Sequence, residues 1–207
     1  MSSDRELVEA WGRGDRAAGS TLFDRYYEPV ARFFFNKVAE DVARDLVQRT
    51  FLGCLEGLAS FRGEGEFRSY LFGIAYRQLC KHYRGAAGDR GRVDFGELSV
   101  ADARPSPSQH FAAGQELRAL LAALQRLPID AQVVLELHYW ESMTTDEIAA
   151  ALELPPGTAR SRLRRGRQLL EESLMSLAGA SNLVDSTLGG RQRWIAAVRE
   201  QIRASKG

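Results

Sequence analysis

The sequence predicts an all-α fold of two small helical domains joined by a flexible linker, the second a helix-turn-helix domain, with a C-terminal helical extension. Apolar residues recur at helical spacing along most of the chain, and no stretch alternates apolar and polar residues as a half-buried strand does. Glycine, proline and serine cluster between the two periodic regions, as is typical of a linker. We therefore divide the chain into residues 1–87, 88–112, 113–177 and 178–207.

The composition fits an ordinary globular protein, because 44% of the 207 residues are hydrophobic and 27% are charged. No apolar run reaches the roughly 18 residues of a membrane span, and the first residues do not have the pattern of an export signal. Cys54 and Cys80 then fit reduced thiols. We expect a cytoplasmic protein without membrane insertion.

Four helices are expected in the first domain. A Ser3-x-x-Glu6 capping box begins the first helix, which ends at the glycines near residue 14. The second runs through Leu22 to Phe35, and Asp41 is expected to cap a third that continues to about Ser60. The fourth covers about residues 68–84.

The second domain shows the same periodicity, interrupted at fixed points. The apolar spacing that begins near Leu117 stops at Pro128 and restarts near Asp130. A Thr144-x-x-Glu147 capping box and the Pro155-Pro156-Gly157 turn then delimit a short helix and a long one that ends near residue 177. In the extension, one helical side is apolar: Trp194, Ile195, Val198 and Ile202.

Residues 144–170 have the layout of a helix-turn-helix motif with an arginine-rich second helix. Five arginines and no acid occur within residues 160–167. At 100° per residue, Ala159, Leu163, Gly166 and Leu170 face inward. The opposite face suits base edges and phosphates, and the alternative is a solvated helix without a partner. Its candidate DNA-binding residues are Thr158, Arg160, Ser161, Arg164 and Arg165.

Two helices of the first domain also present polar faces. On the helix at 68–84, Tyr70, Arg77 and Lys81 lie opposite the apolar side, and a ring beside cations suits an unpaired nucleic-acid strand. A solvated face explains this pattern equally well. On the helix after residue 40, the inward positions are Val47, Phe51, Cys54, Leu55 and Leu58. The outward residues are Asp41, Asp45, Gln48, Arg49 and Leu52, and an exposed leucine among them indicates a protein partner.

Nothing in the sequence marks a catalytic site. His82, His110 and His138 are scattered without metal-ligand spacing, and Cys54 lies on an apolar helix face. We expect no enzyme activity, metal or cofactor.

Three stretches resemble the extracytoplasmic-function (ECF) class of bacterial RNA polymerase sigma factors, in that family's order. Residues 45–51 (DLVQRTF) are similar to its polymerase-docking helix, and residues 60–75 (SFRGEGEFRSYLFGIA) to its melting and −10 segment. Residues 124–128 and 147–163 are similar to its −35 recognition domain.

The resemblance implies that residues 1–87 and 113–177 are sigma domains two and four. The outward residues after position 40 would then dock on the clamp of the largest subunit of core polymerase, and domain four would lie near its flap. The resemblance assigns the −35 element of promoter DNA to the helix that contains Arg164. It assigns the −10 element to Arg62, Gly63, Glu64, Tyr70, Arg77 and Lys81.

Several positions depart from the family pattern. Tyr70 replaces a usual tryptophan, and Arg77 replaces a frequent asparagine. Arg44 and Arg49 stand where acids are usual, which suggests that phosphorylation of Thr50 by a Ser/Thr kinase restores the missing negative charge. The alternative is a half-buried packing threonine and control by an anti-sigma factor.

Two other functional classes remain open from the sequence. One is an ordinary helix-turn-helix regulator in which residues 1–87 form a sensor or dimerisation domain. The other is a helical enzyme of unknown type.

Overall fold

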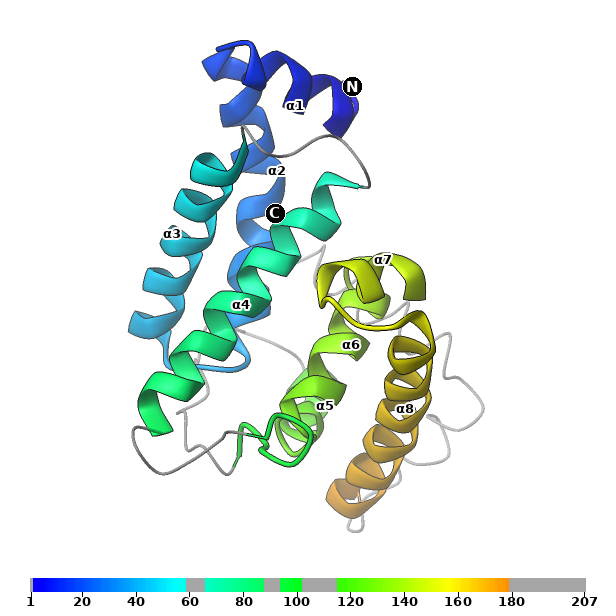
Figure 1. The fold of residues 1–207 in the computed structure, drawn as a ribbon. Coiled ribbons are helices and arrows are strands. Elements are labelled where there is room, and N and C mark those ends of the chain that lie inside the picture. The colour runs from blue at the N-terminus through cyan, green and yellow to red at the C-terminus, as the bar shows by residue number, and fades with distance from the viewer. Residues whose placement is uncertain (1, 59–65, 88–93, 102–114, 179–207) are drawn as a thin grey trace.

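The computed structural model describes residues 2–58, 66–87, 94–101 and 115–178. Within these ranges the chain forms helices without a strand, as the sequence predicts, arranged in two lobes that lie side by side (Figure 1). The N-terminal lobe contains α1 (Asp4–Gly12), α2 (Arg16–Phe35), α3 (Glu40–Gly57) and α4 (Phe67–Ala87). The C-terminal lobe contains α5 (Gln115–Gln125), α6 (Ile129–Tyr139), α7 (Thr145–Ala151) and α8 (Pro156–Ala178).

Local capping sets the helix starts of the N-terminal lobe. Ser3 and Glu6 form the expected capping box of α1, and the Asp15 carboxylate accepts hydrogen bonds from two backbone N–H groups at the start of α2. The expected cap at Asp41 is wrong, because the N-cap of α3 is Ala39, two residues earlier, and it makes no side-chain hydrogen bond. Asp41 instead lies in the first turn, where a carboxylate favours the helix dipole.

The core of the N-terminal lobe lies between α2, α3 and α4. Phe34, Leu71 and Phe72 are fully buried there, and the Phe33 and Phe72 rings meet edge to face at 5.8 Å. The amphipathic side of α1 packs against the first half of α2 (Figure 1). This packing leaves one side of α2 and α3 open to solvent.

Helix α6 is the centre of the C-terminal lobe. Each of its residues from Ile129 to Leu137 is buried, and α5, α7 and α8 surround it. The Thr144–Glu147 capping box starts α7, and Pro156 occupies the first position of α8, where its missing N–H costs nothing. These two helices and their turn make up the expected helix-turn-helix.

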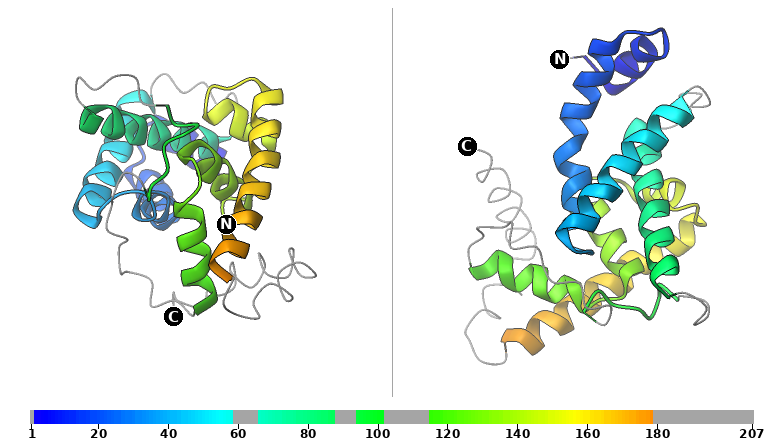
Figure 2. Two further views of the ribbon diagram at one scale, coloured as in Figure 1. Left: turned by 90° about the horizontal axis from the view of Figure 1, so that it is seen from below. Right: turned by 90° about the vertical axis from the view of Figure 1, so that its left-hand side faces the viewer.

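Part of the expected linker packs against both lobes. The backbone N–H groups of Ile129 and Asp130 donate to carbonyls of Leu98 and Phe95, and Ser99 forms an isolated bridge with Pro128. The Phe95 ring lies 6.3 Å from that of Tyr83 on α4. Residues 94–101 therefore connect the end of α4 to the start of α6, as the turned views in Figure 2 show.

Candidate nucleic-acid and protein interfaces

The exposed side of α8 carries the residues that the sequence predicts to contact DNA. Ala159, Leu163 and Gly166 are buried against the rest of the lobe. Gly166 permits close packing, since a Cβ there would lie 3.2–3.3 Å from atoms of α6. The opposite side shows Arg160, Ser161, Arg164 and Arg165 exposed and Thr158 half-buried.

The exposed side chains of α8 differ in how they are held. The Ser161 hydroxyl donates to the Thr158 carbonyl at 2.9 Å, and the Arg160 guanidinium lies 3.6 Å from the Asp146 carboxylate. Among the residues described, Arg164 and Arg165 have no ion-pair partner. They are therefore the cations best placed to contact base edges and phosphates.

Two further arginines of α8 hold the lobe together, a role that the sequence analysis did not assign. The Arg162 guanidinium pairs with Asp130 at 2.8 Å, and that of Arg167 lies 5.5 Å above the Tyr139 ring. Both turn toward α6, on which Asp130 and Tyr139 lie. The helical phase of residues 162 and 167, near the apolar stripe, is the signal that separates them from Arg164 and Arg165.

Helix α4 shows the expected division between an apolar and a polar side. Leu71, Ala75 and Leu79 are fully buried, whereas Arg77 and Lys81 are exposed. Tyr70 is half-buried, and its hydroxyl covers Gly57 so closely that a Cβ there would lie 2.2 Å away. Burial raises the pKa of Tyr70. The expected −10 residues Arg62, Gly63 and Glu64 lie outside the described residues.

The outward side of α3 is largely as expected. Asp41, Asp45, Gln48 and Arg49 are exposed, and Leu52 is 48% exposed. The inward placement of Leu55 is wrong, because 51% of this residue is exposed at the edge that neither α2 nor α4 covers. An apolar strip results on α2 and α3, composed of Phe23, Tyr27, Phe51, Leu52 and Leu55.

A cavity of about 290 Å³ adjoins this apolar strip. Trp11, Gly19, Phe23 and Leu55 are among the residues that line it. The Phe23 and Phe51 rings, 4.5 Å apart, connect α2 to α3 at its border. An exposed apolar patch beside a cavity is typical of a protein-binding surface.

Thr50 does not occupy the position of an accessible modification site. Its side chain is fully buried, and its hydroxyl donates to the Leu46 carbonyl at 2.7 Å. The two nearby cations are also paired within α3, Arg44 with Glu40 and Arg49 with Asp45 at 2.8 Å. The structure does not support the phosphorylation of Thr50 suggested from the sequence and favours the alternative of a packing threonine, which is fully buried: Thr50 packs inside the lobe, and both arginines already have acidic partners.

Cys54 is a core residue, as its helix face predicts. It is 1% exposed, and burial raises the pKa of its thiol to about 12. Within the described ranges, no three histidine, cysteine or acidic side chains meet as metal ligands. No described helix is long and apolar enough to cross a membrane.

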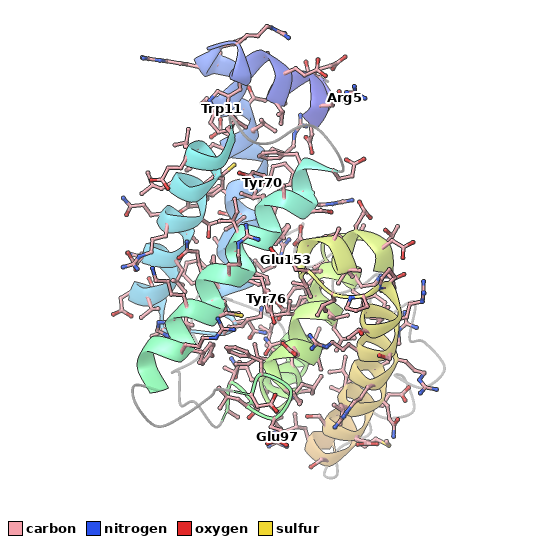
Figure 3. All side chains as sticks on the ribbon, in the orientation of Figure 1. Arg5, Trp11, Tyr70, Tyr76, Glu97 and Glu153 are labelled. Atoms are coloured by element: carbon pink, nitrogen blue, oxygen red, sulfur yellow. The ribbon has the colours of Figure 1, made fainter. Side chains whose placement is uncertain are left out.

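The two lobes meet through polar side chains. Lys37, in the turn after α2, pairs with Glu136 of α6, and the Asn36 amide donates to the same carboxylate at 3.1 Å. Around this centre, the Tyr76 hydroxyl donates to Asp130 at 2.8 Å, on the side of α4 that faces α6 (Figure 3). The sequence analysis missed these contacts between the lobes, because no local spacing links residues that lie 54 to 100 positions apart.

Comparisons with known proteins cover both lobes. A model described as Sigma-70 region 2 matches residues 22–88, and one described as Sigma-70, region 4 matches residues 117–170. The ECF RNA polymerase sigma-E factor of Escherichia coli (strain K12) is 30% identical over 184 residues, which cover 84% of this chain and 96% of that relative. The factor of the same name from Haemophilus influenzae is 28% identical over 186 residues, which cover 84% of this chain and 97% of the relative.

Solved structures share the fold. CnrH, solved in complex with the cytosolic domain of CnrY, matches with a TM-score of 0.64 at 23% identity, over 87% of this chain and 100% of that chain. The sigma factor RpoE of Bartonella quintana, solved with the anti-sigma factor NepR, matches with a TM-score of 0.58 at 21% identity, over 75% of this chain and 95% of that one. With two matching sigma-70 regions and a relative 30% identical over nearly its whole length, this chain belongs to the ECF family of RNA polymerase sigma factors.

Proposed function

We propose that the protein is a non-catalytic initiation factor that binds core RNA polymerase and directs it to promoters through −10 and −35 recognition. The observation that carries the proposal is the exposed face of α8. Arg164 and Arg165 project from a helix whose opposite side is fixed against α6, so this face is rigid and available to the major groove. Thr158, Arg160 and Ser161 flank them.

The N-terminal lobe supplies the remaining contacts in this proposal. The outward residues of α3, namely Asp41, Asp45, Gln48, Arg49 and Leu52, dock on the polymerase clamp. On α4, Tyr70 stacks on an unpaired base of the −10 element, and Arg77 and Lys81 hold phosphates of the same strand. Domain four lies near the polymerase flap when α8 is on the −35 element.

An anti-sigma factor is the regulator that the structure favours over a kinase. The exposed apolar strip on α2 and α3 provides a surface for an apolar segment of such a partner. Solved relatives of the same fold are complexed with an anti-sigma factor in one case and with the cytosolic domain of CnrY in another. A kinase acting on Thr50 would first have to expose a buried side chain.

The experiment that tests the proposal is co-purification with core polymerase, followed by run-off transcription from a promoter selected out of a randomised library. An initiation factor binds the core enzyme and gives transcripts that start at one position downstream of the selected −10 element. A helix-turn-helix regulator binds DNA by itself and leaves the core enzyme unselective. Loss of core binding in a Leu52→Arg variant, with Glu97→Gln as an exposed control outside α3, ties the interaction to the docking surface.

We propose a separate role for the C-terminal extension, residues 178–207. Its apolar stripe, Trp194, Ile195, Val198 and Ile202, lies outside the described residues. We propose that it packs on one of the two domains and modulates activity, since burial of such side chains stabilises by about 25 cal/mol per Å². Deletion of residues 186–207 then changes thermal stability or transcription, and a deletion without either effect contradicts this role.

A further inference from the structure

The second half of α8 extends beyond the contacts that hold its first half. Arg162, Gly166 and Arg167 contact α6, as described above. Further along, the Ser173 hydroxyl donates to the Ala123 carbonyl of α5 at 3.2 Å. Figure 2 shows α5 and the end of α8 side by side at the edge of the C-terminal lobe. Within the described residues, the side of α8 that faces away from α5 is therefore left open here.

This open side is apolar. Leu170, Leu174 and Leu177 are half-buried, and Met175 is 46% exposed. The leucines recur at intervals of three and four residues, so they follow one side of the helix. At 100° per residue, Met175 points about 160° away from Ser173, which contacts α5, and it widens the apolar side on the open flank. We call Leu170, Leu174, Met175 and Leu177 the α8 stripe.

The charge beside the α8 stripe is negative. Glu171 is half-buried and Glu172 is exposed, and no basic residue occurs between Arg167 and Ala178. The last turn of a helix adds partial negative charge through its unpaired carbonyls. An exposed apolar stripe is typical of an interaction site, and the segment that fits this one is amphipathic and basic.

The chain itself contains such a segment after the described residues. Trp194, Ile195, Val198 and Ile202 have the spacing of one side of a helix. Residues 179–207 hold five basic and two acidic residues, so the segment is positively charged. Its basic residues are Arg191, Arg193, Arg199, Arg203 and Lys206.

The length of the intervening chain fits a return to α8. Fifteen residues, 179–193, separate the end of α8 from Trp194. A flexible chain of that length spans about 20 Å on average, and the part of α8 from Gln168 to Ala178 is about 16 Å long. Such a tether also gives the segment an effective concentration of about millimolar, so even a weak contact would be occupied.

The apolar strip on α2 and α3 is the alternative site for this segment. That strip adjoins the cavity lined by Trp11 of α1. Figure 1 shows α1 and the end of α8 at opposite ends of the molecule. Fifteen fully extended residues reach about 50 Å, so binding there would need an almost straight tether, at a high cost in entropy. The α8 stripe is therefore the favoured site.

We propose that residues 191–203 bind as a helix along the α8 stripe, with their apolar side on Leu170, Leu174 and Met175. The arginines of the segment then lie beside Glu171 and Glu172. This inference rests on the role proposed above for the extension, and it names the site. While bound, the segment adds a helix to the C-terminal lobe and keeps other proteins off this side of α8.

Disulfide trapping in the full chain tests the site. Met175→Cys combined with Val198→Cys should give an intramolecular disulfide under mild oxidation, seen as a faster band on a non-reducing gel and by mass spectrometry. The native thiols do not interfere, because Cys54 and Cys80 are buried. Ser176→Cys with Val198→Cys is the matched control. Ser176 is also exposed but lies on the flank of α8 behind α5, so its disulfide should form at least tenfold more slowly.

A third pair of cysteines tests the alternative site. Leu52→Cys with Val198→Cys reports binding of the segment to the apolar strip, and Leu52 matches Met175 in exposure, at 48% against 46%. We expect little intramolecular disulfide from this pair. A product of twice the mass from the Met175→Cys pair would show that the segment binds a second copy of the chain.

Hydrogen exchange measures the same contact without cysteines. Deletion of residues 191–207 should speed amide exchange in residues 168–178 by about tenfold, because the end of α8 loses a covering helix. Met175→Lys should have a similar effect, since it places a cation against a basic segment. Ser176→Lys is the matched control, and it should exchange as the wild type does, because it adds the same charge outside the α8 stripe.

The proposal is overturned if the Met175→Cys pair reacts no faster than the Ser176→Cys pair. It is also overturned if the Leu52→Cys pair reacts faster, if the product joins two chains, or if the deletion leaves exchange in α8 unchanged. None of these measurements uses polymerase or DNA. Core binding and run-off transcription, which test the proposed function, therefore succeed or fail independently of this site.

Discussion

The ammonium of Lys37 and the carboxylate of Glu136 form an ion pair that joins the two lobes and is almost completely shielded from water. The pair links the turn after α2 to α6, between residues 99 positions apart in the sequence. Asn36 and Gln132 share the same carboxylate. Each charge is therefore compensated only while the lobes remain together, which makes their contact sensitive to the loss of either partner.

Removing one partner of this ion pair should destabilise the contact between the lobes more than removing both partners. Glu136→Leu leaves the Lys37 ammonium buried without a counter-charge, a change that typically costs about 3–5 kcal/mol. The double variant Lys37→Met/Glu136→Leu removes both charges and should recover much of that loss. Urea unfolding measures the loss of stability, and small-angle X-ray scattering measures separation of the lobes. Both are needed, because the lone Lys37 ammonium can return to water either by unfolding or by separation of the lobes. Additive losses in the double variant would contradict this coupling.

Substitutions on α8 should separate base recognition from stability. Arg164→Ala or Arg165→Ala should reduce discrimination at one base pair of the −35 element by about 1–3 kcal/mol, if that side chain binds a base edge. Arg167→Ala is the contrasting control, because its guanidinium packs on Tyr139 inside the lobe. It should lower the melting temperature without changing base preference. An unchanged promoter preference and affinity in both Arg164→Ala and Arg165→Ala would contradict the proposed docking of α8.

The sequence sufficed for features determined by local spacing. The capping residues Ser3 and Thr144 form the bonds that their motifs predict, and the buried and exposed sides of α8 follow from 3.6-residue periodicity. Leu55 was misplaced because its side of α3 would need a further helix to cover it, and periodicity does not report how many neighbours a helix has. The contact of Lys37 with Glu136 was invisible for a related reason, since only the tertiary fold brings α2 and α6 together.

Gly19 is required for the packing of α1 on α2. A Cβ at this position would lie 2.5 Å from Nε1 of Trp11, within a wall of the cavity beside the apolar strip. Gly19→Ala should therefore displace the indole and cost about 1–3 kcal/mol, partly offset by the better helix propensity of alanine. A shift in tryptophan fluorescence should accompany the loss. Gly12→Ala, where no atom lies within 4 Å, is the control and should leave both signals unchanged.

Acid should weaken the start of α7 through Glu147. Burial raises the pKa of this carboxyl, but hydrogen bonds from Thr144 and the charge of Arg68 outweigh burial and hold the pKa below its ordinary value. A carboxyl with a depressed pKa in the folded state stabilises above its unfolded pKa of 4.5, and this contribution is lost as pH falls through the folded value.

The measurement is the free energy of unfolding against pH, on the wild type and on Glu147→Gln. Glutamine keeps the capping geometry but does not titrate, so the variant should lose less stability than the wild type below about pH 4.5. Glu56→Gln, an exposed change on α3, should retain the wild-type pH dependence. Identical curves for wild type and Glu147→Gln would show that the interactions with Thr144 and Arg68 do not stabilise the fold.

Two substitutions of Thr50 distinguish a threonine that packs in the core from one that is switched by negative charge. Its side chain is fully buried with its hydroxyl on the Leu46 carbonyl, so Thr50→Val should cost about 0.5–1.5 kcal/mol through the lost hydrogen bond. Thr50→Glu places an unpaired carboxylate in the core and should destabilise the N-terminal lobe far more, with weaker polymerase binding as a consequence. Arg49→Gln removes one positive charge on the exposed side of α3, the same change in net charge as Thr50→Glu, and serves as the control for charge outside the core. Tighter polymerase binding by Thr50→Glu than by the wild type would show that negative charge at this position activates docking, contrary to its burial.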